Sequence, residues 1–95
     1  MARKYEAIYI LNPALGDEAV QATSEKIQAL FESAATVEKI DVWGRRRLAY
    51  EINDQKEGYY VLIDFSAEAE FPKELERVLK ITEGVMRYLV VRTDD

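Results

Sequence analysis

The sequence predicts an α+β fold in which two helices cover one face of a four-stranded antiparallel sheet. Three observations support this prediction. Apolar residues alternate with a period of two in four segments, and two other segments carry apolar residues at helical spacing. Along the chain these segments follow the order strand, helix, strand, strand, helix, strand, which is the split β-α-β (β-α-β-β-α-β) arrangement. Both helices of that arrangement lie on one side of the sheet, so its other face is expected to stay open.

The first third of the chain is expected to contain a strand and a helix. Residues 3–12 alternate as a strand does, and Asn12-Pro13 ends it. The helix is expected to begin at residues 16–18, with acidic residues in its first turn, and to end near Ala35. Its inward-facing stripe is Val20, Ile27, Leu30, Phe31 and Ala34.

The middle of the chain is expected to form a long hairpin. Its first arm is residues 37–43, and the side chains that share one face of this arm are Val37, Lys39, Asp41 and Trp43. Gly44 and the arginines after it interrupt the alternation, which indicates a bend or bulge. The arm then resumes with Leu48, Tyr50 and Ile52. Residues 53–58 are a turn by composition, and residues 59–65 form the second arm.

A second helix and a last strand complete the fold. Pro72 suits the first turn of a helix, because its missing N–H needs no partner there. The side chains that this helix turns inward are Leu75, Val78 and Leu79. Glu83-Gly84 ends the connection, and the last strand is residues 85–92.

The strands carry apolar residues on both faces, although helices on one side require only one apolar face. The apolar residues on the face away from the helices are Ile8, Ile10, Tyr60, Leu62, Leu89 and Val91. If they form one contiguous patch, it has the size that usually marks an interaction site. Scattered exposed apolar side chains are also common and need no explanation, so this alternative stays open.

The composition excludes most kinds of enzyme. The chain contains no cysteine and no histidine, so it lacks thiolate ligands, cysteine nucleophiles and the commonest neutral-pH base. Its four glycines are dispersed, and its 18 acidic residues are expected on solvated faces. We therefore expect no catalytic residue, no cofactor and no metal. We also expect one domain over residues 1–95, without signal peptide or membrane span, in the cytoplasm.

Basic residues are concentrated at a few places, although the net charge is −5. These places are Arg3-Lys4, the run Arg45-Arg46-Arg47, Arg87 and Arg92. The run stands beside Trp43 and Tyr50, and aromatic and cationic side chains together are typical of proteins that bind single-stranded or looped RNA. A solvated loop would explain the run equally well. Tyr5 and Trp43 are expected in the core rather than at a binding surface.

Several segments of the chain resemble one known family. They are residues 3–6 (RKYE), 11–13 (LNP), 43–52 (WGRRRLAYEI), 58–60 (GYY) and 87–92 (RYLVVR). Together they closely resemble the family of the sixth protein of the bacterial small ribosomal subunit, over nearly the whole chain. Residues 44–52 are the most specific part of the match. The resemblance implies a ferredoxin-like fold, no catalysis, and a structural role on 16S ribosomal RNA beside a basic partner, the eighteenth small-subunit protein.

The resemblance also implies where RNA and the partner bind. The residues expected near RNA phosphates are Arg3, Lys4, Arg46, Arg47, Arg87 and Arg92. The partner is expected to form a heterodimer through the open face of the sheet. The residues expected to contact it are Ile8, Ile10, Leu48, Tyr50, Tyr60, Leu62 and Leu89. Whether Arg46 and Arg47 meet RNA or the partner stays open at this point.

Two other functions are compatible with this order of elements. A regulatory domain would pair its sheet with a second copy and hold a small metabolite at the interface, so it should be a homodimer on its own. An acylphosphatase-like enzyme would need an anion-binding loop after the first strand. Residues 12–16 lack the arginine that such a loop requires.

Overall fold

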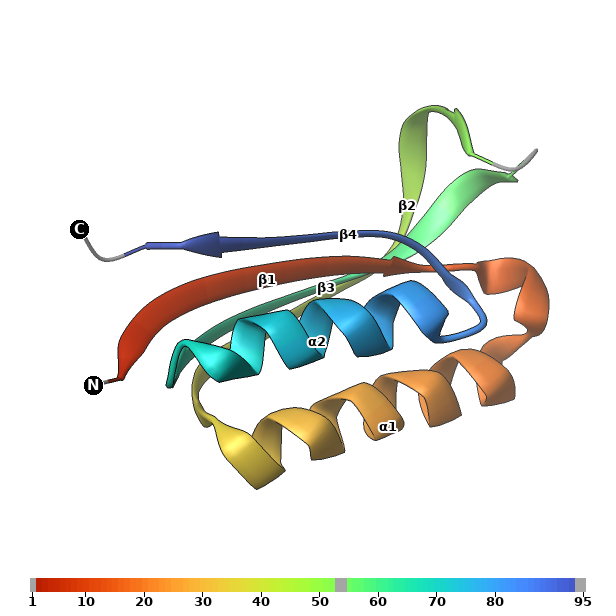
Figure 1. Cartoon of the computed structure of the whole chain (residues 1–95). Helices are drawn as coiled ribbons and strands as arrows, with labels where there is room; N and C mark the ends of the chain where they lie inside the picture. The colour runs from red at the N-terminus through yellow and green to blue at the C-terminus, as the bar shows by residue number, and fades with distance from the viewer. Residues whose placement is uncertain (1, 53–54, 94–95) are drawn as a thin grey trace.

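A computed structural model of the chain describes residues 2–52 and 55–93. Its elements are β1 (Arg3–Leu11), the 3-10 turn η1 (Pro13–Leu15), α1 (Asp17–Ala34), β2 (Thr36–Ile52), β3 (Gln55–Ala67), α2 (Glu70–Ile81) and β4 (Val85–Arg92). The strands form one antiparallel sheet in the order β2-β3-β1-β4, and both helices lie on the same side of it (Figure 1). The predicted α+β fold and its open face are confirmed.

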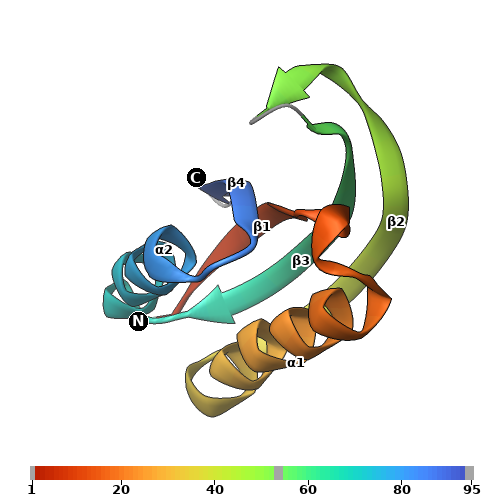
Figure 2. The ribbon, with the colours of Figure 1, turned by 90° about the vertical axis from the view of Figure 1, so that its right-hand side faces the viewer.

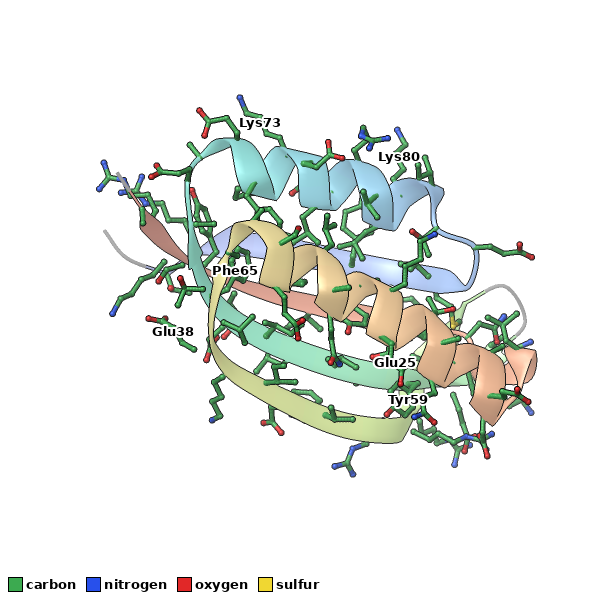
Figure 3. The ribbon with its side chains drawn as sticks, turned by 90° about the horizontal axis from the view of Figure 1, so that it is seen from below. Glu25, Glu38, Tyr59, Phe65, Lys73 and Lys80 are labelled. Carbon is green, nitrogen blue, oxygen red and sulfur yellow. The ribbon has the colours of Figure 1, made fainter. Side chains whose placement is uncertain are left out.

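The hydrophobic core lies between the helices and the two central strands. β1 and β3 turn alternate side chains toward the helices, and the largest fully buried ones are Tyr9, Leu11, Val61, Ile63 and Phe65. The buried apolar residues of the helices are Val20, Ile27 and Phe31 in α1, and Phe71, Leu75 and Leu79 in α2. Figure 3 shows Phe65 on this helix side, whereas Lys73 and Lys80 of α2 point away from it. No helix in the described residues is long and apolar enough to span a membrane.

Three phenylalanines join both helices to the sheet. The ring centroids of Phe31 and Phe65 are 4.9 Å apart, and Phe71 lies 5.5 Å from Phe31 and 5.6 Å from Phe65, all in edge-to-face geometry. Phe71 lies in the first turn of α2 and was missing from the predicted inward stripe. The opposite error concerns Ala34, which is exposed because it is the last residue of α1.

The hairpin of β2 and β3 differs from the prediction in two respects. A bulge at Glu38 places Val37 opposite Phe65 and Lys39 opposite Asp64, so Val37 faces the helices and does not share a face with Lys39. One extra residue in a strand reverses the side-chain alternation beyond it. β3 also begins at Gln55 rather than near Tyr59, because Gln55, Glu57 and Gly58 pair with β2 instead of forming a turn. Residues 53–54 of the predicted turn lie outside the described residues.

The far end of the hairpin bends over the open face of the sheet (Figure 2). A second register shift separates Val42 from Gly44, where the sequence predicted a bulge, and Gly44 has a φ of 76°. Such a bulge increases the twist of a strand and bends it. The bent arm brings Tyr50 of β2 to Arg87 of β4, although β3 and β1 lie between these two strands in the sheet.

Candidate protein and nucleic-acid interface

Three apolar side chains form a row across the open face. Cross-strand pairing places Ile8 of β1 directly between Leu62 of β3 and Leu89 of β4. Leu89 is 55% exposed, and Ile8 and Leu62 are partly exposed. Side chains directly opposite in a sheet have Cβ atoms about 4.5–5.5 Å apart, so these three make one continuous surface, which we call the apolar row.

Two carboxylates lie beside the apolar row. Glu6 of β1 is directly opposite Asp64 of β3, one step further along the same face, and both are partly exposed. Like charges directly opposite each other destabilise a sheet. This pair, which we call the acidic pair, therefore favours a positively charged group placed over it. Lys39 of β2 is next to Asp64 on the other side.

Aromatic rings and arginines gather at the other end of the open face. Trp43 of β2 stacks on Tyr60 of β3, with ring centroids 5.9 Å apart and an interplanar angle of 19°. Trp43 is 42% exposed, so its expected place in the core is wrong, whereas Tyr5 does pack against the core. Trp43, Tyr60, Arg46 and Arg47 together line one open hollow. We call these four residues the aromatic–arginine cluster.

The three consecutive arginines do not share one environment. Arg45 Nη2 lies 3.2 Å from Glu57 Oε1, and it forms this ion pair at the base of the hairpin. Arg45 also lines a separate hollow with Glu25 and Tyr59. Figure 3 shows Glu25 of α1 and Tyr59 of β3 close together on the helix side of the sheet. Arg46 and Arg47 are exposed and form no ion pair within the described part of the chain.

Two of the expected RNA and partner contacts meet each other inside the chain. Arg87 Nη1 donates a hydrogen bond to Tyr50 Oη at 2.5 Å, and the guanidinium carbon of Arg87 lies 5.4 Å from the centroid of the Tyr50 ring. Ile10 and Leu48 are only 7% and 9% exposed, and both approach Gly58 beneath the bent hairpin. These two therefore offer little surface to another molecule.

The remaining expected RNA contacts lie at the opposite end of the sheet. Arg3 and Lys4 begin β1, and Arg92 at the end of β4 pairs with Tyr5. All three side chains are exposed. Figure 1 shows the two chain ends together at one end of the sheet and the hairpin at the other. From Lys4 to Ile10, β1 spans about 20 Å at about 3.3 Å per residue, so the expected cations form two groups rather than one patch.

Tyr9 is a buried titratable group on the helix side. Its hydroxyl shares a hydrogen bond with Ser24 Oγ at 3.3 Å. Burial raises the pKa of Tyr9 above its ordinary value of 10.0, and the hydrogen bond to Ser24 opposes part of this effect. The phenol thus stays protonated near neutral pH, and the pair stabilises the core. Within residues 2–52 and 55–93, no three acidic side chains gather closely enough to hold a metal ion.

Comparisons with known proteins agree on one family. The family model described as "Ribosomal protein S6" matches residues 4–92. The chain is 53% identical over 93 residues to the small ribosomal subunit protein bS6 of Clostridium novyi, covering 97% of this chain and 98% of that protein. It is 49% identical over 90 residues to the protein of the same name from Clostridium botulinum, covering 94% and 96%. The crystal structure of 30S ribosomal protein S6 from Thermotoga maritima matches with a TM-score of 0.91 at 27% identity, covering 98% of this chain and 89% of that one.

Proposed function

This chain belongs to the ribosomal protein S6 family, and we propose on that premise that it joins a basic partner protein to 16S ribosomal RNA in the small subunit of the bacterial ribosome. Its role there is structural, and it is not an enzyme. The partner that the family implies is the eighteenth small-subunit protein, bound as a heterodimer.

The observation that carries this proposal is the apolar row beside the acidic pair. The row of Leu62, Ile8 and Leu89 supplies apolar surface that the helices do not cover. Glu6 and Asp64 add negative charge next to it, which suits a basic partner and repels an acidic one. The same pair disfavours the alternative homodimer, because two copies joined face to face would bring four carboxylates together.

The two groups of exposed cations support the second half of the proposal. Arg3, Lys4 and Arg92 at one end, and Arg46 and Arg47 at the other, can contact phosphates about 20 Å apart along the sheet. Phosphate contacts fix the position of a protein on nucleic acid, and the shape of the folded RNA then provides selectivity. A chain with a net charge of −5 has to bind RNA through such local groups rather than through its overall charge.

Leu62→Asp tests the protein half of the proposal. It puts a charge at one end of the apolar row, next to Ile8, while leaving the helix side untouched, so the chain should stay folded by circular dichroism. Its affinity for the purified partner should fall by at least about tenfold in a calorimetric titration. The matched control is Ile81→Asp, which introduces the same charge at an exposed site at the end of α2 and should bind like wild type.

Arg3→Ala combined with Lys4→Ala tests the RNA half. Each phosphate contact contributes about 0.9 to the slope of log K against log salt on a duplex and about 0.7 on a single strand. The double variant should therefore bind the ribosomal RNA fragment, in the presence of the partner, with a slope smaller by about 1.4–1.8. An unchanged slope would remove this end of the sheet from the RNA interface.

Sedimentation of the purified chain alone tests the alternative function, because a homodimer would support the regulatory domain.

A further inference from the structure

The stacked pair of Trp43 and Tyr60 is an aromatic surface that the described residues leave partly uncovered. The planes of the two rings are nearly parallel, at 19°. Trp43, the single tryptophan of the sequence, keeps 42% of its surface exposed. A large apolar ring gains stability from burial, whereas in this hairpin Ile10 and Leu48 are buried against Gly58 instead. The open hollow beside the two rings is therefore ready to receive a flat apolar group.

Both charged side chains that line this hollow are arginines, and neither forms an ion pair within the described residues. Asp41 lies on the same face opposite Leu62 and does not line the hollow. Arg46 and Arg47 line it together with the two rings. In register, Arg47 is opposite Glu57, but the Glu57 carboxylate is engaged by Arg45 Nη2 at 3.2 Å. Arg46 is opposite Gly58, which carries no charge. Two guanidinium groups thus flank a flat aromatic surface, and this combination matches a nucleotide: a base to stack and phosphates to pair.

We propose that the aromatic–arginine cluster binds an unpaired base of single-stranded or looped RNA, stacked on the Trp43–Tyr60 pair, with the adjoining phosphates on Arg46 and Arg47. This inference rests on the proposed function and deepens it, because it assigns one part of the open face to RNA. The base is recognised by its π-face, so the cluster accepts any base, and selectivity comes from which nucleotide the folded RNA leaves unpaired.

Charge explains why the aromatic–arginine cluster binds RNA while the apolar row and the acidic pair bind protein. A basic partner is repelled by Arg46 and Arg47 and attracted by Glu6 and Asp64, which lie further along the same face. The open face is thereby divided between two binding partners. The apolar row with the acidic pair belongs to the protein, and the aromatic–arginine cluster belongs to the nucleic acid.

The fluorescence of the single tryptophan reports on this site directly. The purified chain is titrated at low ionic strength with heptauridylate RNA, and separately with an abasic ribose-phosphate oligomer of the same length. Stacking of a base on Trp43 should quench the fluorescence with heptauridylate and not with the abasic oligomer. Because this comparison uses the wild-type chain, it does not depend on the folding of any variant.

Variants then separate the contribution of the Tyr60 ring to binding from that of the two arginines. Tyr60→Leu should weaken the quenching interaction by about fivefold or more, the lower end of what a stacked base contributes, whereas Tyr60→Phe should bind like wild type. Arg46→Ala with Arg47→Ala should lower the salt slope by about 1.4. Arg77→Ala, which removes an arginine from the exposed side of α2, is the matched control and should leave the titration unchanged.

Three results would overturn the inference. Equal quenching by the abasic oligomer would reduce the site to a phosphate contact. If Arg77→Ala and the combined Arg46→Ala and Arg47→Ala lower the affinity for RNA equally, the binding depends only on the overall charge of the chain. If Tyr60→Leu lowers the affinity for the purified basic partner without RNA, the cluster is a protein surface. In each case the proposed function stands as long as Leu62→Asp still breaks the heterodimer and the wild-type pair still binds the ribosomal RNA fragment.

Discussion

Gly58→Ala should show how tightly the hairpin closes on the open face. An ideal Cβ at Gly58 would lie 2.3 Å from Ile10 Cγ2 and 3.3 Å from Leu48 Cδ2. The φ of Gly58 is outside the left-handed region, so the strain in this variant comes from the collision alone. The Leu48 methyl is at the end of a flexible side chain and can move. The Ile10 methyl is attached to a branched Cβ in a central strand and cannot turn away without leaving its rotamer.

The expected cost follows from this collision. Inserting a methyl group into a packed core costs about 1–3 kcal/mol, and alanine recovers about 0.4–1 kcal/mol of that by restricting the unfolded chain. The free energy of unfolding should therefore fall by about 1–2 kcal/mol, and Tm by about 4–8 °C for each kcal/mol. Urea unfolding followed by circular dichroism measures this change directly.

A double-mutant cycle identifies the cause. Ile10→Ala removes the colliding methyl and costs about 2–5 kcal/mol by itself. Combined with Gly58→Ala, it should cost less than the sum of the two, by about 0.5–3 kcal/mol, because the added methyl then occupies vacated space. Gly44→Ala is the control, since its φ of 76° strains alanine but nothing lies within 4 Å of its Cβ. It should add to Ile10→Ala within about 0.5 kcal/mol. Additive costs for the Gly58→Ala pair would refute the packing argument.

Two further predictions concern the helix side. Phe31→Ala should lower the free energy of unfolding by about 3–5 kcal/mol in urea, because it leaves a cavity between Phe65 and Phe71. Burial raises the pKa of Tyr9 above 10.0, so the native state keeps a proton that the unfolded chain releases, and stability should fall as the pH rises above about 10. Tyr9→Phe should make this decline smaller between about pH 9 and 11, and an identical decline would show that Tyr9 does not contribute.

The order of the elements and the faces of three strands could be predicted because periodicity reports them directly. In β1, β3 and β4 the alternation runs without interruption through the central residues, and β4 begins and ends where the sequence indicates. The bulge at Glu38 was not predicted. Its signal is the charged pair Glu38-Lys39, after which the helix-facing apolar residue moves from the odd position of Val37 to the even position of Ile40, and no glycine marks it.

The candidate site was only partly predictable, because alternation tells which residues share a face but not what covers that face. Trp43 was expected in the core, yet it lies on the open face beside Tyr60. Val42 on the other face is 48% exposed, although the helices lie on that side. The same limit applies to Ile10 and Leu48, whose side chains meet at Gly58 and are buried there. The sequence indicates the bend at Gly44, but the place where the bent arm lands depends on contacts between residues far apart in the chain, such as Tyr50 with Arg87.

The position of the acidic residues explains how a chain with a net charge of −5 can serve both a basic protein and an RNA. Charges more than about 8–10 Å apart at the surface are largely screened at physiological salt, so each binding partner responds to the groups it touches. From Glu6 to Ile10, β1 spans about 13 Å, which exceeds this screening length. The acidic pair at Glu6 can therefore attract a cationic partner without cancelling the field of the arginines beyond Ile10. Within this gap Asp41 of β2 lies opposite Leu62. Leu62→Asp would set a second carboxylate there in place of apolar surface, and it should therefore weaken the heterodimer.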